Sequence, residues 1–261
     1  MRHMTDLRHT HEITYDGDRV VKRYLDSKPG AAEREWRALT LLAEHAPGLA
    51  PEPITLDGGV VTMSRLDGVP LRGLFARAKH VGAMAEALSQ VHAAVPGHVL
   101  RTVPVRPWGR EAIVDWITRR CTAWEPRESL ADRAVKEGLR WVESWSPGDA
   151  GVRPAFGTGD GNLANFLWDG TRVRVVDFED SGRSDVAFEV AELAEHVSMW
   201  VDGDVEVAHR FELSPQEDRR MRDCRKALSL AWLFLLSHEH PRNPPGTFLR
   251  QAERALATLG A

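Results

Sequence analysis

The residues of this chain whose types and spacing could do chemistry are concentrated between positions 156 and 184. This stretch reads FGTGDGNLANFLWDGTRVRVVDFEDSGRS and contains Asp160, Asn165 and Asp177. Carboxylate and amide oxygens are ligands that Mg²⁺ accepts in proteins. Asp160 lies among three glycines, at positions 157, 159 and 161, which would let the backbone approach a substrate closely. The stretch therefore indicates a substrate-contacting loop followed by a metal site.

A predicted β-hairpin brings two of these residues together. Positions 165–168 have the composition of a strand, Asp169-Gly170 is a hairpin turn signal, and positions 172–176 alternate like a returning strand. Asn165 and Asp177 are thereby left at the open end of the hairpin, where opposed side chains lie roughly 5 Å apart. Two oxygen ligands at that separation can share one Mg²⁺, because each binds at about 2.1 Å.

The order Asp-x₄-Asn, hairpin, Asp-Phe-Glu resembles the catalytic loop and metal segment of the aminoglycoside phosphotransferases. These enzymes belong to the protein-kinase-like superfamily together with the choline kinases. The resemblance implies that Asp160 is the catalytic base, which accepts the proton of a substrate hydroxyl. It implies that Asn165 and Asp177 hold Mg²⁺ on the phosphates of ATP. It also implies that Asp185 hydrogen-bonds the backbone of the catalytic loop.

One position departs from the resembled pattern. The family usually has a histidine two residues before the base, and this chain has Thr158. Because that histidine mainly orients the loop, we expect altered loop support rather than lost chemistry. Thr158 and the short N-terminus favour an alternative, a nucleotide-binding pseudokinase that acts as a regulator. The presence of Asp160, Asn165 and Asp177 argues against that alternative.

Two charged residues nearer the N-terminus are candidates for nucleotide binding. Lys22 shares one face of a predicted strand with apolar and aromatic neighbours, and a lysine buried there would need a partner for its ammonium group. Glu35 lies at the end of the apolar stripe of a helix predicted over 31–45. In the resembled family the strand lysine holds the α- and β-phosphates and a helix glutamate pairs with it, which indicates Lys22 and Glu35, with Glu33 as the alternative. From the residues alone, Lys22 could also be an edge lysine with its ammonium in water.

The end of a further predicted hairpin corresponds to the hinge of the kinase fold, whose backbone binds adenine. The residues at this place are Met63, Ser64, Arg65 and Leu66. Their side chains do not decide between a hinge and one more strand, since a hinge acts through its backbone. The loop that covers the phosphates in the kinase fold needs a strand before it, and only positions 1–10 precede the first clear strand. We expect that strand to be short, over Met4–Arg8, or absent.

The helix predicted after the metal segment carries glutamates at three-residue spacing, which form an acidic stripe. In the resembled family the acceptor binds in a cleft lined by this helix and the C-terminal helices. Acidic side chains there would attract a cationic acceptor, so Glu192 and Glu195 are the predicted substrate residues. A solvated helix face is the alternative, and it is also the prediction for the arginines at 219, 220, 222 and 225. The acidic residues concerned are Glu189, Glu192, Glu195, Asp202, Asp204 and Glu206.

Composition excludes several classes of protein. The 261 residues are 43% apolar and 28% charged, as in soluble globular proteins. The net charge of −4 provides no basic field for nucleic acid. Cys121 and Cys224 are too far apart for a disulfide framework or a zinc site, and a cytoplasmic location is expected. The N-terminus lacks an apolar signal region, and the longest apolar run, 227–236, is about half the length that crosses a bilayer, so we expect no membrane association.

Together these patterns predict an α+β, bilobal, protein-kinase-like fold. Positions 1–66 would form a nucleotide-binding lobe with a small antiparallel sheet and one helix. Positions 67–261 would form a larger, mostly helical lobe for catalysis and substrate binding. The expected activity is Mg²⁺-dependent transfer of the γ-phosphate of ATP to a hydroxyl of a small molecule, such as an aminoglycoside-like antibiotic. A choline-like, sugar or amino-alcohol metabolite is the alternative acceptor, and we expect a monomer or weak dimer.

Overall fold

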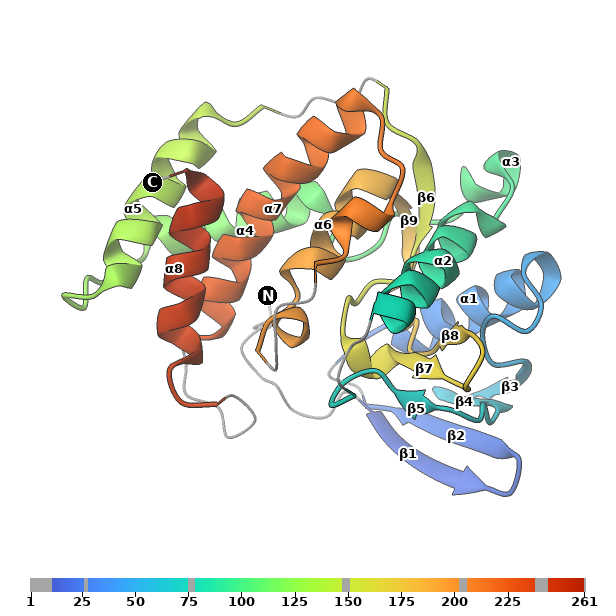
Figure 1. Cartoon of the computed structure of the whole chain (residues 1–261). Coiled ribbons are helices and arrows are strands. Elements are labelled where there is room, and N and C mark those ends of the chain that lie inside the picture. Colours follow the sequence, from blue (N-terminus) through green and yellow to red (C-terminus); the bar gives the residue numbers. More distant parts are fainter. Residues whose placement is uncertain are drawn as a thin grey trace.

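The chain folds into a small part built on a β-sheet and a larger part built mainly from helices (Figure 1). The computed structural model describes residues 11–25, 28–74, 78–146, 151–201, 206–237 and 244–260. The short strand expected over Met4–Arg8 lies outside the described residues, as do Asp202 and Asp204.

The N-terminal sheet begins with a hairpin whose turn the sequence specifies. Gly17 has a φ of 58°, in the left-handed region that favours glycine, and the chain reverses there between β1 (His11–Asp16) and β2 (Arg19–Tyr24). β4 (Val60–Ser64) pairs with the other edge of β2, and β3 (Pro53–Asp57) pairs with β4. The result is an antiparallel sheet in the order β1-β2-β4-β3, with the strand of Lys22 in its interior.

The helix predicted over 31–45 is α1 (Ala31–His45), which packs on β3 and β4. Its apolar residues recur three and four positions apart, and Ala38, Leu39 and Leu42 are fully buried. Glu35 lies on the same side of the helix and is only 1% exposed. The period of the sequence therefore directs one carboxylate into the interior beside the sheet.

Two small sheets lie between the N-terminal sheet and the helices. β5 (Val69–Pro70), β7 (Phe166–Trp168) and β8 (Val173–Val175) form an antiparallel sheet in the order β5-β7-β8. β7 and β8 are the hairpin predicted from the sequence. β6 (Pro154–Gly157) pairs with β9 (Gly182–Asp185) in the second small sheet. The boundary expected at position 66 falls between β4 and β5, which belong to different sheets.

The larger part consists mainly of helices whose apolar sides face one another. α4, α5, α7 and α8 lie together on one side of the molecule, and α6 lies between them and β6 and β9 (Figure 1). α6 is buried along almost its whole length. The helices are α2 (Ala78–Ala94), α3 (Gly97–Leu100), α4 (Arg110–Thr122), α5 (Leu130–Ser144), α6 (Val186–Glu195), α7 (Pro215–Leu235) and α8 (Thr247–Leu259).

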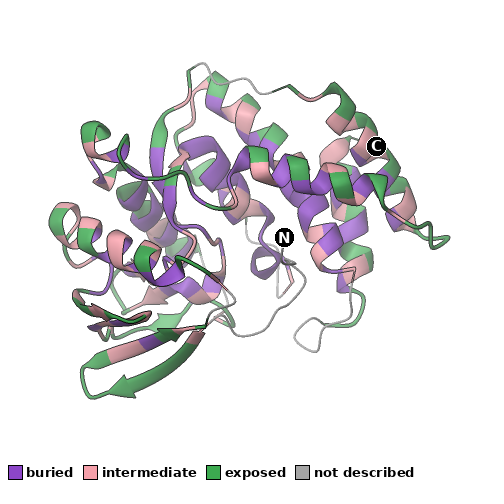
Figure 2. Ribbon diagram, turned by 180° about the vertical axis from the view of Figure 1, so that it is seen from behind, coloured by how far each residue is buried: buried purple, intermediate pink, exposed green. Residues whose placement is uncertain are grey.

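A continuous apolar interior runs through both parts (Figure 2). Phe156, Phe166 and Phe178 are among its largest fully buried side chains, and they lie next to the predicted catalytic and metal-binding residues. Burying each side chain stabilises the fold by about 1.5–3 kcal/mol. Buried aromatic side chains next to the candidate site residues therefore hold these loops on the protein interior.

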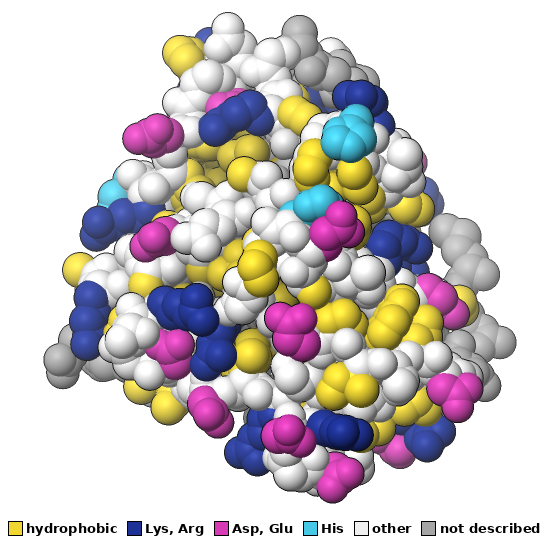
Figure 3. Space-filling view, turned by 90° about the vertical axis from the view of Figure 1, so that its right-hand side faces the viewer, with side chains coloured by type: hydrophobic (Ala, Val, Ile, Leu, Met, Phe, Trp, Pro, Cys, Tyr) yellow, Lys and Arg dark blue, Asp and Glu magenta, His cyan; other side chains and the backbone are white. Residues whose placement is uncertain are grey.

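Three further observations concern the surface, the helices and the cysteines. On the face that carries α1, α2 and α3, cationic and anionic side chains are interspersed, with no large area of one sign (Figure 3). None of the described helices is both long and apolar enough to cross a membrane. Cys121 and Cys224 are both free and buried.

Candidate active site

Pairing between β6 and β9 places the predicted catalytic loop beside the predicted metal segment. The last residue of β6 pairs with the first residue of β9, so residues 158–162 and 177–181 leave the ladder at the same end. At Gly159, φ is 93°, and a Cβ built there would lie 2.3 Å from the carbonyl carbon of Asp180. Only glycine allows this approach. The two segments are thus packed backbone against backbone.

Asp160 is surrounded by hydrogen-bond donors. Its Oδ1 accepts from the backbone amide of Asn162 at 3.0 Å, and its Oδ2 accepts from Nδ2 of Asn165 at 3.1 Å. Nε2 of His196 lies 3.3 Å from Oδ1. Burial of the carboxyl raises its pKa, but the contact with His196 and the other donors outweigh this and hold the pKa of Asp160 below its usual value. The Asp160 carboxyl is therefore ionised, and 38% of its side chain is exposed.

His196 was not found from the sequence, although it contacts the predicted base. It follows α6, and its Nδ1 accepts a hydrogen bond from the Ser198 backbone amide at 3.1 Å. The ring proton therefore lies on Nε2, which donates to Asp160. The hydroxyl of Ser198 lies 2.7 Å from the same Nδ1 and accepts from the amide of Leu163 at 2.9 Å. This chain of contacts fixes the ring relative to the catalytic loop.

Lys22 joins the N-terminal sheet to the metal segment. Its Nζ lies 3.3 Å from Oε2 of Glu35 and 2.6 Å from Oδ1 of Asp177. The predicted ion pair between Lys22 and Glu35 is thus confirmed. Burial alone would lower the pKa of Lys22, but the surrounding carboxylates raise it above its usual value. Oε2 of Glu35 also accepts from the Tyr24 hydroxyl at 3.0 Å and from the Phe178 amide at 2.7 Å, so the helix is tied to the metal segment as well.

Two further carboxylates in the metal segment are paired with a second lysine. Lys28 donates to Oε1 of Glu179 at 2.7 Å and to Oδ2 of Asp180 at 2.6 Å. His11 lies 3.0 Å from the other oxygen of Glu179. The run Asp-Phe-Glu-Asp at 177–180 is the sequence signal for this cluster. Lys28 could not be identified in advance, because it precedes α1 and stands more than 150 positions before its partners.

The residues present fit a magnesium ion bound partly by phosphate. Asn165 lies in a 3₁₀ turn (Leu163–Asn165) directly before β7 rather than in the strand, and the orientation of its Nδ2 toward Asp160 leaves the amide oxygen for a ligand. Lys22 engages one oxygen of Asp177. In the described part of the chain, no three His, Cys, Asp or Glu side chains gather as a metal site. Mg²⁺ commonly takes only one or two protein ligands when phosphates and water complete its coordination, and one carboxylate and one amide oxygen meet that need.

The predicted hinge residues lie at the end of β4 and directly after it. Met63 is buried in β4, and the amide of Ser64 donates to the Glu52 carbonyl at 2.9 Å. The amide of Arg65 donates to the Asp18 carbonyl at 2.7 Å. These two amides are therefore already used within the sheet, and a base would have to bond to other backbone groups of this segment, such as the amide of Leu66.

Arg106 supports the catalytic loop at the place where Thr158 replaces the family histidine. This 2% exposed arginine donates from Nη2 to the Gly159 carbonyl at 2.9 Å and from Nη1 to Oε1 of Glu189 at 2.7 Å. The other oxygen of Glu189 accepts from the Thr158 amide at 3.1 Å. In this chain the loop is thus held by Arg106 and Glu189. Arg106 gave no sequence signal, because it stands about fifty positions before the loop, outside any motif.

The glutamates of α6 do not form the free acidic stripe that was expected to attract a cationic acceptor, so that prediction was wrong. Both oxygens of Glu192 accept from the guanidinium of Arg106 at 2.6 Å. Glu195 is fully buried, with Oε1 2.6 Å from Nε of Arg225 and Oε2 3.6 Å from Nη2 of Arg254. Buried carboxylates need such partners. The glutamates of this helix therefore fasten it to its neighbours, and their charge is compensated before any acceptor binds.

Asp185 also differs from its expected role. Its Oδ1 accepts from the Phe188 amide at 3.0 Å and caps the N-terminus of α6, and its Oδ2 lies 2.5 Å from Nη2 of Arg220. None of the hydrogen bonds described for this residue reaches the backbone of the catalytic loop. The loop is supported by Arg106 and Glu189 instead.

Comparison with known proteins agrees with this geometry. A family model described as the phosphotransferase enzyme family matches residues 9–224. No curated protein sequence matches the chain. Among solved structures, a choline/ethanolamine kinase family protein from Mesorhizobium loti has a TM-score of 0.67 at 18% identity, over 97% of this chain and 86% of that one.

Two antibiotic phosphotransferases are similar in structure. The GDP complex of wild-type aminoglycoside 2'-phosphotransferase-IIIa has a TM-score of 0.59 at 18% identity, over 96% of this chain and 88% of that one. Spectinomycin phosphotransferase in complex with ADP and spectinomycin has a TM-score of 0.59 at 12% identity, over 96% and 93%. The predicted protein-kinase-like fold is thus confirmed. Because the family model covers most of the sequence, the chain belongs to the phosphotransferase enzyme family, as an enzyme of the small-molecule kinase class.

Proposed function

We propose that this phosphotransferase moves the γ-phosphate of ATP to a hydroxyl group of a small organic acceptor. The observation that carries the proposal is an ionised Asp160 beside Asn165, in a loop packed against the segment where Asp177 contacts Lys22. Phosphoryl transfer depends mainly on positioning and charge stabilisation. These four residues offer a base, two oxygen ligands and a cation, which is what that chemistry needs.

The nucleotide would bind between the proposed lobes 1–66 and 67–261. Lys22 is the residue for the α- and β-phosphates, because its ammonium is buried, charged and held by two carboxylates. The base would lie against the Met63–Leu66 backbone. The similar structures with bound GDP and ADP support a purine nucleotide as phosphate donor.

Asp177 and the amide oxygen of Asn165 are the proposed ligands of Mg²⁺. When bound, the ion neutralises charge that develops on the phosphates. The positive φ of Asp177, 69°, is a strained conformation for a residue other than glycine. The residue that follows it, Phe178, is fully buried, and Oδ1 of Asp177 contacts Lys22, so the segment is held on both sides of this position.

Asp160 would accept the proton of the acceptor hydroxyl as the new bond forms. His196 is proposed as a positioning residue, because its Nε2 contacts Oδ1 of Asp160 while Ser198 fixes its other nitrogen. Asn165 and the backbone amide of Asn162 complete the set of donors. The carboxylate is thereby oriented before any substrate arrives, which reduces the cost of reaching a reactive geometry.

The acceptor class is to be found by experiment. Aminoglycoside-like antibiotics and choline-like amino alcohols are the first compounds to test, because similar structures include a kinase family for each. The test incubates the protein with γ-labelled ATP, Mg²⁺ and a panel of hydroxylated compounds, and measures label in the acceptor. Transfer to a hydroxyl supports the proposal. Tight ATP binding without transfer to any compound would favour the alternative, a nucleotide-binding regulator.

A further inference from the structure

A basic pocket lies between α7 and α8, on the helical part of the molecule. It has a volume of about 570 Å³, within the range of sites for small molecules. None of the residues that line it belongs to the candidate active site. The lining residues are Arg219, Arg222, Asp223, Arg225, Lys226, Arg254, Ala257 and Thr258.

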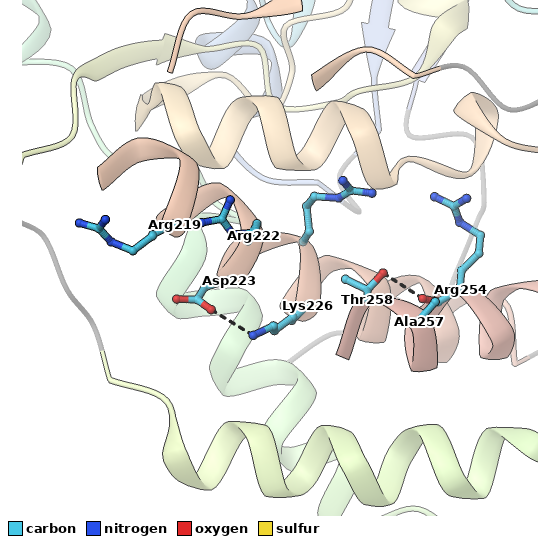
Figure 4. A pocket seen from close by; sticks show the side chains of 8 residues that line it. Arg219, Arg222, Asp223, Lys226, Arg254, Ala257 and Thr258 are labelled. Carbon is cyan, nitrogen blue, oxygen red and sulfur yellow. Dashed lines mark hydrogen bonds and ion pairs between the residues drawn. The ribbon is translucent and has the colours of Figure 1, made fainter. Parts of the chain in front are cut away.

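Helical spacing gathers the positive charges. The cations of α7 stand three and four positions apart, which places them on one side of that helix, and Arg254 lies on α8 opposite them (Figure 4). The lining contains five cationic side chains and one carboxylate, Asp223. The sequence indicated only a solvated arginine face here, because the contribution of α8 depends on tertiary packing.

Neighbouring carboxylates compensate only part of this charge. The buried Glu195 pairs with Arg225 and Arg254 of the lining. Asp218 pairs with Arg222. Among the described residues, the formal count is five cations in the lining against these two carboxylates and Asp223, a difference of two positive charges. Like charges three or four positions apart repel one another on a helix, so an anion in the pocket would relieve repulsion within the protein.

We propose that this pocket binds a small soluble polyanion that carries at least two phosphate or carboxylate groups. Guanidinium groups offer paired donors that match the oxygens of such anions. A concave basic surface also concentrates an anionic ligand more strongly than scattered charges do. The mixed charges of the face shown in Figure 3 provide no comparable gathering. The proposal uses none of the residues assigned to phosphate transfer, so it can be tested without that activity.

The test is calorimetric titration with pyrophosphate in EDTA at low ionic strength, with orthophosphate as the single-group control. The pocket variant is Arg219→Gln/Arg222→Gln, in which both changed side chains are exposed, so the fold should persist. The matched control is Arg119→Gln/Arg140→Gln, with two exposed arginines outside the pocket. We expect pyrophosphate to bind at least tenfold more tightly than orthophosphate, and at least tenfold more weakly to the pocket variant than to the wild type or the control.

Pyrophosphate could also bind to the lysines of the candidate active site, so a second titration tests these residues. Lys22→Gln is titrated in the same way, and Lys28→Gln replaces it if the buried substitution does not fold. Unchanged affinity in this arm supports the pocket. The proposal is overturned if pyrophosphate does not bind the wild type, if the pocket variant binds it as well as the control does, or if binding is lost only in the lysine variant. It is also overturned if an acidic peptide binds the pocket and pyrophosphate does not.

Discussion

Replacing Gly159 by alanine tests how the catalytic loop is held against the metal segment. The new Cβ would lie 2.3 Å from the carbonyl carbon of Asp180, and backbone cannot rotate away as a side chain could. Reaching the 3.4 Å of an ordinary contact requires a displacement of about 1 Å. The φ of 93° adds a conformational cost of about 1–3 kcal/mol for any residue with a Cβ, and the steric overlap adds about 1–3 kcal/mol more.

We therefore expect Gly159→Ala to lower the free energy of unfolding by about 2–6 kcal/mol. A displacement of 1 Å at a catalytic loop reduces turnover by about 10²-fold. Gly170→Ala is the matched control, because Gly170 has a similar φ of 104° but no atom within 4 Å of its built Cβ. Gly170→Ala should lower the free energy of unfolding only by the conformational cost of about 1–3 kcal/mol, and its kcat should stay unchanged.

The assay combines urea unfolding with steady-state kinetics on the identified acceptor. Gly159→Ala should differ from Gly170→Ala in both stability and kcat. Equal losses of stability and equal turnover in the two variants would refute the close packing of the loop on Asp180.

Three further predictions concern the metal, the base and a helix cap. Asp177→Ala should weaken nucleotide binding much more in Mg²⁺ than in EDTA, and equal losses by calorimetry in both conditions would argue against a metal ligand. His196→Gln should lower kcat about tenfold or more with unchanged nucleotide affinity, since it perturbs the geometry of Asp160; a full kcat would remove its positioning role. Glu217 pairs with Arg153 and accepts a hydrogen bond from the backbone amide of Ser214, the N-cap residue of α7, and these contacts lower the pKa of Glu217 from 4.5 to about 2. Its contribution to stability is complete above pH 4.5 and is lost as the pH falls toward 2. Glu217→Gln should lower the free energy of unfolding by about 1–2 kcal/mol at pH 7 and flatten its decline below pH 4.5, and an unchanged decline by urea unfolding would contradict this.

The contacts that depend on the spacing of apolar residues or on a short motif could be predicted from the sequence. The position of Glu35 on the buried side of its helix followed from the spacing of apolar residues, and its pairing with Lys22 from the resemblance to the phosphotransferase family. The hairpin followed from its turn residues, and the catalytic loop from the motif that carries the same resemblance. In each case the information lies within a few positions of the residue concerned.

What the sequence did not carry are the contacts between distant segments. Arg106 reaches Glu192 from 86 positions away, and nothing local distinguishes a glutamate that is paired from one that faces water. The acidic stripe was misread for this reason. His196 likewise reaches Asp160 only because α6 ends beside the loop. Predicting these contacts requires the packing of α6 against the rest of the molecule, which helical periodicity does not determine.

The central claim is that Asp160 is the base of a phosphate transfer from ATP. Its most direct test is Asp160→Asn, which keeps the size of the side chain and removes the negative charge. With an acceptor identified by label transfer, we expect kcat to fall by about 10²–10⁴-fold, while calorimetry shows unchanged affinity for ATP. A variant that retains the kcat of the wild type would contradict the assignment of the base, and with it the proposed arrangement of the active site.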